Sequence, residues 1–194
     1  MARNRPSGKV RIIGGQWRRR WLPVADVDGL RPTTDRVRET LFNWLGAKCH
    51  GARVLDLFAG SGALGFEAMS RGARSLTLID QDRQVTRTLA EVVSLLEAQR
   101  VEVITADARR WLQAQPAKPF DIVFIDPPFR DADAAHLCTL LLEFGWLTPA
   151  AVLYVEQPAD RPSELPQPLT VIKEKTAGQV RYGLHTVLRE TPNE

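Results

Sequence analysis

"RVLDLFAGSGALGFEAMSR", residues 53–71, decides the fold of this chain. An apolar run rich in branched residues leads into a loop of small residues, and a second apolar run of helical character follows at once. Gly60, Gly62 and Gly65 give the loop the spacing GxGxxG. Such glycines let the backbone turn tightly and approach a ligand at the N-terminus of the next helix. The segment therefore predicts a strand, loop and helix of an α/β domain, with a ligand site at the loop.

The segments after this one repeat the alternation of strand and helix. Strands are predicted over residues 53–58, 75–80, 101–105, 120–125 and 151–156, and helices over residues 62–71, 82–98, around Trp111 and over 133–143. Helices of this length between strands imply right-handed crossovers and a parallel sheet. Two last strand-like runs, 169–175 and 180–190, have no helix between them, so we expect a hairpin whose final strand enters antiparallel. The pattern predicts a doubly wound α/β domain of about seven strands, which binds ligands at the carboxyl ends of those strands.

Positive charge is concentrated at the start of the chain. Residues 1–38 contain 10 Lys and Arg residues against 3 Asp and Glu residues, a net charge of +7, whereas the 194 residues together carry only +3. We therefore expect a basic N-terminal extension over residues 1–32 that binds RNA, followed by the α/β domain over residues 33–194. Charge alone leaves open a solvated basic edge or tail as the alternative.

Arginine and aromatic residues are interleaved in this extension. The stretch "RIIGGQWRRRWLP", residues 11–23, places three consecutive arginines between Trp17 and Trp21. Guanidinium groups bind phosphates and unpaired bases stack on flat rings, so this composition suits RNA. A membrane-surface role is less favoured because the segment lacks a helical apolar face. The residues predicted to contact RNA are Arg11, Trp17, Arg18, Arg19, Arg20 and Arg38.

An amphipathic helix is predicted directly after the extension. In "RPTTDRVRETLFNWL", residues 31–45, apolar residues recur at helical spacing. One of the three polar residues 33–35 can cap the first turn. The helix therefore presents Arg36 and Arg38 near its start.

Two acidic residues lie where predicted strands end. Asp80 ends the strand 75–80, 20 residues after Gly60, where a carboxylate can accept hydrogen bonds from both hydroxyls of a ribose. Asp107, just past the strand 101–105, could reach an adenine amino group. Each aspartate could instead serve only as the N-cap of the next helix. With the glycine loop, Asp80 fits an adenosine-containing cofactor, either NAD or S-adenosylmethionine.

"DPPF", residues 126–129, ends a further apolar strand. Two successive prolines lack N–H donors and have a fixed φ, so they leave a stiff turn with free carbonyls. An amino group on a nucleobase is a poor nucleophile because its lone pair is delocalised into the ring, so it needs acceptors that favour a pyramidal nitrogen. Asp126 and the carbonyl of Pro127 can supply them, with Pro128 stiffening the turn. Phe129 can stack on a base swung out of its surroundings, although an ordinary Asp-Pro turn closed by a core phenylalanine is the alternative.

Other residue types argue against several classes of protein. Cys49 and Cys138 form no CxxC pair, so we expect them to be reduced and structural. The three histidines are scattered without metal-ligand spacing, so no metal site is expected. No apolar stretch approaches the roughly 18 residues of a membrane span. We expect a cytoplasmic protein without a membrane partner.

We call DPPF, residues 126–129, the catalytic turn. This turn favours S-adenosylmethionine over NAD as the cofactor, because a nicotinamide dehydrogenase has no use for such a turn. The chain resembles the class I S-adenosylmethionine-dependent methyltransferases, and more closely the RsmD-type enzymes that methylate the N2 amino group of a guanine in bacterial 16S ribosomal RNA. The similarity covers nearly the whole length. The segments that carry it are "RIIGGQWRRRWL", "RPTTDRVRETLFNWL", "VLDLFAGSGALGFEA" and "FDIVFIDPPF".

The resemblance implies a Rossmann-like class I methyltransferase fold and specific roles at the cofactor. It implies that Asp56 and the glycine loop handle the methionine part, and that the helix with Arg36 and Arg38 closes over it. It assigns the ribose to Asp80 and the adenine to Asp107 with Ala108. Gln81 is a further residue expected to bind the cofactor. The expected partner is 16S rRNA or a small-subunit assembly intermediate, bound by a monomer.

Two other functions stay open at this point. An adenine-N6 methyltransferase of DNA or RNA would share the catalytic turn, but a DNA enzyme needs a target-recognition domain for which 194 residues leave little room. A non-catalytic RNA-binding module for ribosome assembly would explain the basic extension but not the DPPF turn.

Overall fold

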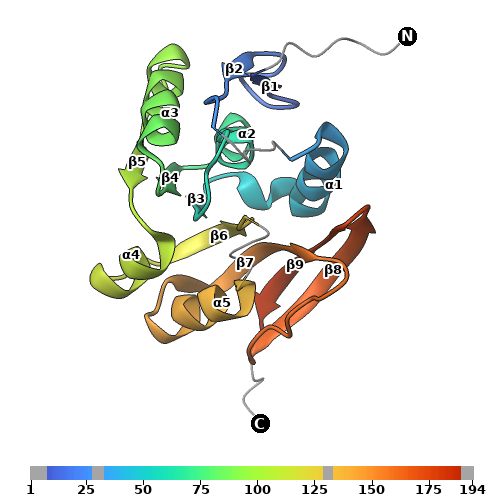
Figure 1. The fold of residues 1–194 in the computed structure, drawn as a ribbon. Coiled ribbons are helices and arrows are strands. Elements are labelled where there is room, and N and C mark those ends of the chain that lie inside the picture. Colours follow the sequence, from blue (N-terminus) through green and yellow to red (C-terminus); the bar gives the residue numbers. More distant parts are fainter. Residues whose placement is uncertain (1–7, 28–32, 129–132, 189–194) are drawn as a thin grey trace.

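The computed structural model describes residues 8–27, 33–128 and 133–188 (Figure 1). Its strands are β1 (Lys9–Arg11), β2 (Trp21–Pro23), β3 (Arg53–Asp56), β4 (Ser75–Asp80), β5 (Val101–Thr105), β6 (Phe120–Ile125), β7 (Leu147–Pro158), β8 (Leu169–Ala177) and β9 (Val180–Val187). Its helices are α1 (Asp35–Leu45), the 3-10 helix η1 (Gly46–Cys49), α2 (Ala63–Ser70), α3 (Arg83–Leu95), α4 (Ala108–Ala114) and α5 (Ala134–Glu143). The predicted order of strands and helices is confirmed.

Seven of these strands form one sheet in the order β5-β4-β3-β6-β7-β9-β8. The five strands from β3 to β7 pair in parallel, whereas β9 is antiparallel to both β7 and β8. The hairpin therefore inserts its second strand beside β7 and leaves β8 at the edge, opposite β5 (Figure 1). This confirms the predicted mostly parallel sheet with an antiparallel last strand.

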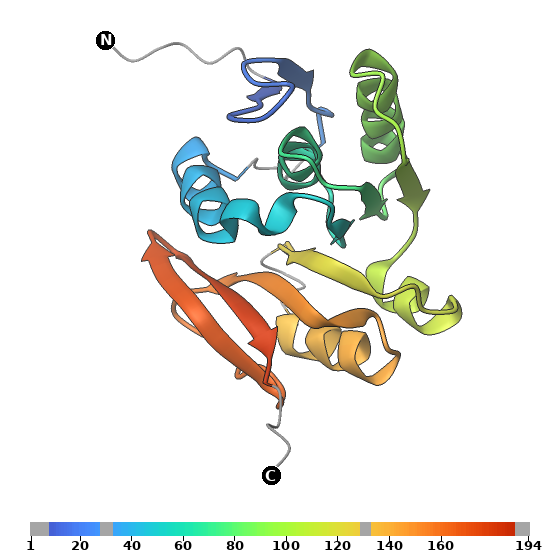
Figure 2. The ribbon, with the colours of Figure 1, turned by 180° about the vertical axis from the view of Figure 1, so that it is seen from behind.

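Helices cover both faces of the sheet, and the alternation of side chains along β6 shows why. Ile122 and Phe124 point into a core shared with α1, α2 and α3. Val123 and Ile125 point into a second core shared with α4 and α5. Because successive strand residues face opposite sides, a strand that is apolar throughout must be covered on both. Figures 1 and 2 show the resulting three layers.

The N-terminal segment folds as a small antiparallel hairpin, β1 with β2, that packs on α2. Its apolar side chains, such as Ile12 and Leu22, belong to the same core as α1 and α2. At Gly15 φ is 73°, and an added Cβ would lie 1.8 Å from the Ser70 carbonyl oxygen, so only glycine fits this approach. Residues 8–27 thus share their core with the sheet rather than projecting from it.

Strand β7 begins earlier than its apolar run indicates. The predicted strand covered residues 151–156, but pairing starts with Phe120 opposite Leu147. An irregularity in the register between Phe120 and Ile122 absorbs the additional residues of β7. The more polar start of β7 is recruited by this pairing, which hydrophobicity does not reveal.

Several global expectations can be compared with the described residues. Cys49 and Cys138 are free and buried, which confirms the structural reading of both. Among the residues described, no helix is long and apolar enough to cross a membrane. Within the same ranges no group of His, Cys, Asp and Glu side chains is arranged to hold a metal ion.

Candidate active site

Acidic residues gather where the parallel strands end. Asp56 and Asp80 are the last residues of β3 and β4, and Asp126 follows β6 directly. These three strands are neighbours in the sheet, so their carboxyl ends meet at one edge. The sequence prediction that these residues share one site is consistent with this placement.

The glycine loop lies between β3 and α2 at that edge. Gly60 and Gly62 have positive φ values of 49° and 71°. A Cβ on Gly62 would come within 2.6 Å of Phe66, and one on Gly65 within 2.7 Å of Leu78. The first two glycines therefore shape the turn, and Gly65 allows α2 to pack closely on β4.

Asp80 holds this loop in place. Its Oδ2 accepts a hydrogen bond from the Gly60 backbone N–H at 3.0 Å, and its Oδ1 accepts one from the Asp82 backbone N–H at 2.9 Å. Burial raises the pKa of the Asp80 carboxyl above its usual range. Each carboxylate oxygen has a second lone pair, so these bonds leave Asp80 able to accept from ribose hydroxyls as well. Gln81, next to it, is exposed.

Asp107 lies at the end of the neighbouring strand and caps a helix. Its Oδ1 accepts a hydrogen bond from the Arg110 backbone N–H at 3.0 Å, at the start of α4. Ala108, the first residue of α4, is buried in the core on that face of the sheet. The capping role that the sequence left open is therefore present, and contact with an adenine stays a prediction.

Asp56 is a buried acceptor without a full set of partners. Its Oδ1 makes no hydrogen bond within the described structure, although the residue is only 2% exposed. Burial, with the charge of Asp126 as the second cause, raises the pKa of Asp56 to about 7. An unpaired buried oxygen beside the glycine loop fits a ligand that brings a positive charge or a hydrogen-bond donor. The residues present therefore fit a cationic cofactor such as S-adenosylmethionine.

Asp126 is half-buried and is held by Thr33, two residues before α1. The Thr33 hydroxyl donates a hydrogen bond to Asp126 Oδ2 at 3.2 Å. Burial raises the pKa of Asp126 to about 6. Pro127 is buried and Pro128 exposed, whereas Phe129 lies outside the described residues. The stacking role of Phe129 therefore stays a prediction.

Glu156 is a site residue that sequence reasoning missed. Phe124 pairs with Tyr154 and Ile125 with Val155, so continuing the register sets Asp126 beside Glu156. Burial together with the Asp126 charge raises the pKa of Glu156 to about 8. The Tyr154 hydroxyl donates to Glu156 Oε1 at 2.5 Å. An acidic residue at the end of an apolar strand was the available signal. We call Asp56, Asp126 and Glu156 the acid cluster.

The predicted RNA contacts divide into exposed and buried residues. Arg18, Arg19 and Arg20 are exposed, and the partly exposed Arg11 lies over the Trp21 ring at 5.8 Å. The predicted RNA contacts of Trp17 and Arg38 need correction, because both side chains are buried. Trp17 is 9% exposed and packs in the core, while Arg38 is fully buried and pairs with Asp35 at 2.6 Å. Trp21, 42% exposed, is the aromatic ring of this segment that RNA can reach.

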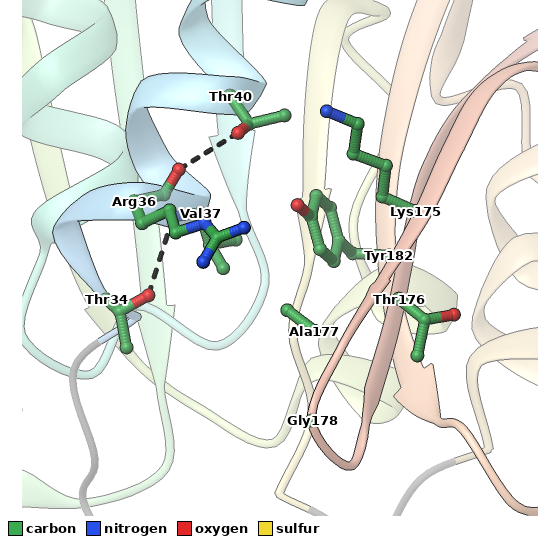
Figure 3. Close-up of a pocket in the computed structure, with 9 residues that line it drawn as sticks. All are labelled: Thr34, Arg36, Val37, Thr40, Lys175, Thr176, Ala177, Gly178 and Tyr182. Carbon is green, nitrogen blue, oxygen red and sulfur yellow. Dashed lines mark hydrogen bonds between the residues drawn. The ribbon is translucent and has the colours of Figure 1, made fainter.

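A pocket of about 320 Å³ opens beside the site (Figure 3). Its walls come from the first turns of α1 and from the β8–β9 turn, and Tyr182 lies between them. Arg36, which the resemblance places over the methionine end of the cofactor, lines this pocket. Its contact with a cofactor stays a prediction.

Comparison with known proteins identifies close relatives of this chain. A family model described as "Conserved hypothetical protein 95" matches residues 10–186. The Ribosomal RNA small subunit methyltransferase D of Escherichia coli strain K12 is 49% identical over 180 residues, which are 92% of this chain and 90% of that protein. The protein of the same name from Haemophilus influenzae is 46% identical over 181 residues, 92% of this chain and 94% of its own.

Solved structures agree with this result. The structure titled "Putative methyltransferase yhhF from Escherichia coli" superposes with a TM-score of 0.84 at 48% identity, covering 93% of this chain and all of that one. A putative methylase from Haemophilus influenzae superposes with a TM-score of 0.81 at 44% identity, covering 94% of this chain. This chain therefore has the same fold as these two solved structures.

Proposed function

The chain belongs to the Conserved hypothetical protein 95 family, and from this premise we propose that it transfers a methyl group from S-adenosylmethionine to the N2 amino group of a guanine in 16S rRNA. The relatives named small subunit rRNA methyltransferase D support the reaction class and the RNA substrate. The observation that carries the proposal is the convergence of Asp56, Asp80 and Asp126 at one sheet edge beside the glycine loop. We place the reaction in the cytoplasm, carried out by a monomer on 16S rRNA or on a small-subunit assembly intermediate.

The cofactor supplies a methyl group on a positively charged sulfur. On this proposal, Asp80 with Gln81 binds its ribose, and Asp107 with Ala108 borders its adenine. Asp56 offers its unpaired oxygen to the methionine part, next to Gly60. The negative charge of the acid cluster favours a positively charged group, because the like charges repel one another until a cation enters.

The target amine is prepared by the catalytic turn. Asp126 and the Pro127 carbonyl accept hydrogen bonds from the amino hydrogens, which directs the nitrogen lone pair toward the methyl group. Transfer of the methyl group to the nitrogen would break its bond to sulfur, leave the cofactor as a neutral thioether, and require the nitrogen to lose one proton. Asp126 is suited to accept it, because burial raises the pKa values of both Asp126 and Glu156, and the Asp126 charge raises that of Glu156 further. The pair therefore binds a proton more readily than an exposed carboxylate does.

A test in cells distinguishes this function from the two alternatives. Nucleosides of ribosomal RNA and of DNA from cells with and without the gene are compared by mass spectrometry, with complementation by the wild-type protein and by Asp126→Ala. We expect one N2-methylguanosine of 16S rRNA to disappear without the gene and to return only with the wild-type protein. Loss of N6-methyladenine instead would support an adenine enzyme, and no loss of either mark would support the non-catalytic module.

A further inference from the structure

The pocket beside the site carries positive charge on two sides (Figure 3). Arg36 enters from the first turn of α1 and Lys175 from the end of β8, and both are exposed. The nine lining residues include no Asp or Glu. Within the described part of the chain, neither Arg36 nor Lys175 forms an ion pair, whereas Glu174 is held by Arg181 at 2.8 Å. Lys175 lies over the Trp44 ring at 5.9 Å, but no carboxylate neutralises either cation within the described residues. Two cations at one hollow without a paired acid suit an anionic ligand.

The pocket is connected to the catalytic turn through the sheet. Lys175 pairs with Tyr182 across β8 and β9, and Tyr182 pairs with Glu156 across β9 and β7. Asp126 lies beside Glu156 on the next strand, so the four residues form one row across the sheet. With neighbouring strands about 4.8 Å apart, Lys175 is about 14 Å from Asp126 along this row. An RNA strand with its target base at Asp126 would therefore pass close to the pocket.

A second connection runs through α1. Thr33 donates a hydrogen bond to Asp126, and the next residue, Thr34, caps α1 and lines the pocket. The same short segment therefore borders both the catalytic aspartate and the pocket.

The chemistry of the lining favours a phosphate over a base. The Tyr182 ring is 4% exposed and is stacked on Trp44 with ring centroids 5.6 Å apart, so it offers no open face on which a base could stack. Arg36 and Lys175 offer charged N–H donors. A backbone phosphate matches this combination of donors.

We propose that the pocket between α1 and the β8–β9 turn binds a backbone phosphate of the RNA strand next to the target nucleotide, with Arg36 and Lys175 as its donors. This inference rests on the proposed function and adds a place where the enzyme holds the strand beside the reacting base. It assigns Arg36 to the RNA rather than to the cofactor. Lys175 acts as a binding residue that leaves the chemical step itself unchanged.

The test measures RNA affinity separately from turnover. Lys175→Ala and the matched control Lys118→Ala each remove one exposed lysine, but Lys118 precedes β6 at the opposite end of the strands. We expect Lys175→Ala to weaken binding of unmethylated 16S RNA about tenfold, as for one charge-assisted contact. The slope of log affinity against log salt should flatten by about 0.7, the value for one phosphate on a single strand. Lys118→Ala should change neither quantity, and Lys175→Arg should restore both.

Binding and kinetics together give a decisive result. Arg36→Ala should weaken RNA in the same way, with the KM for RNA raised, kcat retained, and the affinity for S-adenosylmethionine unchanged by calorimetry. Equal effects of Lys175→Ala and Lys118→Ala, an unchanged salt slope, or a loss of cofactor affinity in Arg36→Ala would each overturn the proposal. Because binding is measured without turnover, failure of the phosphate site can be told from failure of the proposed reaction.

Discussion

Two groups of wholly or partly buried charges, one joining α1 to α2 and the other at the carboxyl ends of the strands, differ in sign balance. The first, which we call the arm cluster, comprises Asp35, Arg38, Glu67 and Arg71, in which acids and bases alternate. The second is the acid cluster, in which only carboxyl groups meet. Both are costly to bury in isolation, so the way each charge is balanced indicates what the cluster does.

The arm cluster is balanced internally in charge, although Nε and Nη1 of Arg38 make no hydrogen bond within the described structure. Glu67, fully buried, accepts hydrogen bonds from the backbone N–H groups of Ile13 and Gly14 at 2.7 and 2.8 Å, and Arg71 pairs with it at 2.8 Å. Arg38 donates to the Arg11 carbonyl at 2.8 Å. These contacts fasten the N-terminal hairpin to the α/β domain, which is a structural role.

The acid cluster is not balanced within the described chain. Burial raises the pKa values of all three carboxyl groups, and the Asp126 charge raises those of Asp56 and Glu156 further. Perturbed carboxyl groups at the carboxyl edge of a parallel sheet are typical of a reaction site. The comparison indicates that buried opposite charges stabilise this fold, whereas buried like charges await a ligand.

Removing the centre of the arm cluster should have the largest effect on stability. Glu67→Ala leaves Arg71 and two backbone donors without their acceptor, so we expect the free energy of unfolding to fall by about 3–5 kcal/mol, as for a broken buried ion pair. Chemical denaturation measures this. The control Glu91→Ala removes the partner of Arg87, an 83% exposed side chain, and should change stability by less than about 0.5 kcal/mol. Similar losses in both variants would show that the arm cluster is not what fastens the hairpin.

Replacing Asp80, the carboxylate proposed to bind the ribose, should have the next largest effect, on cofactor affinity. Asp80→Ala removes a predicted acceptor for two hydroxyls and the acceptor that fixes Gly60. We expect S-adenosylmethionine to bind more weakly by about 1.5–3 kcal/mol in calorimetry. Asp121→Ala is the control, because Asp121 also accepts a backbone N–H, from Arg53 at 2.8 Å, but at the amino end of the strands. Unchanged affinity in Asp80→Ala would remove Asp80 from the cofactor site.

The smallest expected effect is the pH dependence of cofactor binding. Asp56 has a pKa of about 7 and attracts a cation only when ionised. Affinity for S-adenosylmethionine should therefore fall about tenfold between pH 8 and pH 6 from this group alone. The Asp56→Asn variant should have a clearly flatter dependence and keep only the part that Asp126 and Glu156 contribute. A wild-type affinity that is flat over this range would contradict the role of Asp56.

The same raised pKa has the opposite consequence for the ligand-free protein. Because the folded carboxyl holds its proton to about pH 7, whereas its ordinary pKa is 3.8, the folded state binds more protons between these values. Asp56 therefore lowers the stability of the free protein as pH rises through this window. S-adenosylmethionine should offset that loss, because its positive charge favours the ionised carboxylate.

Local sequence signals predicted the fold and part of the site. Strands β5 and β6 match their apolar runs, and the cap of α1 is Thr34, one of the three polar residues proposed for it. The placement of Asp80 and Asp126 followed from a simple rule, that parallel strands end at a common edge.

Long-range contacts account for what the sequence did not predict. Glu156 joins the site only through the register of β7 against β6, which apolar patterning does not specify. The burial of Trp17 depends on Ser70, whose hydroxyl accepts its backbone N–H at 2.9 Å from 53 positions along the chain. The pattern of charges in the sequence does not distinguish an N-terminal segment that packs on the domain from one that is surrounded by solvent.

If the acid cluster carries out the reaction, single-turnover methyl transfer by Asp126→Asn should be slow. Purified protein is saturated with S-adenosylmethionine and mixed with 16S RNA that lacks the mark, and N2-methylguanosine is measured over time beside cofactor affinity and thermal stability. We expect a rate reduced at least about 100-fold, with cofactor affinity little changed and stability at pH 8 equal or higher. A rate close to that of the wild type, with the same product, would show that the acid cluster does not carry out the reaction.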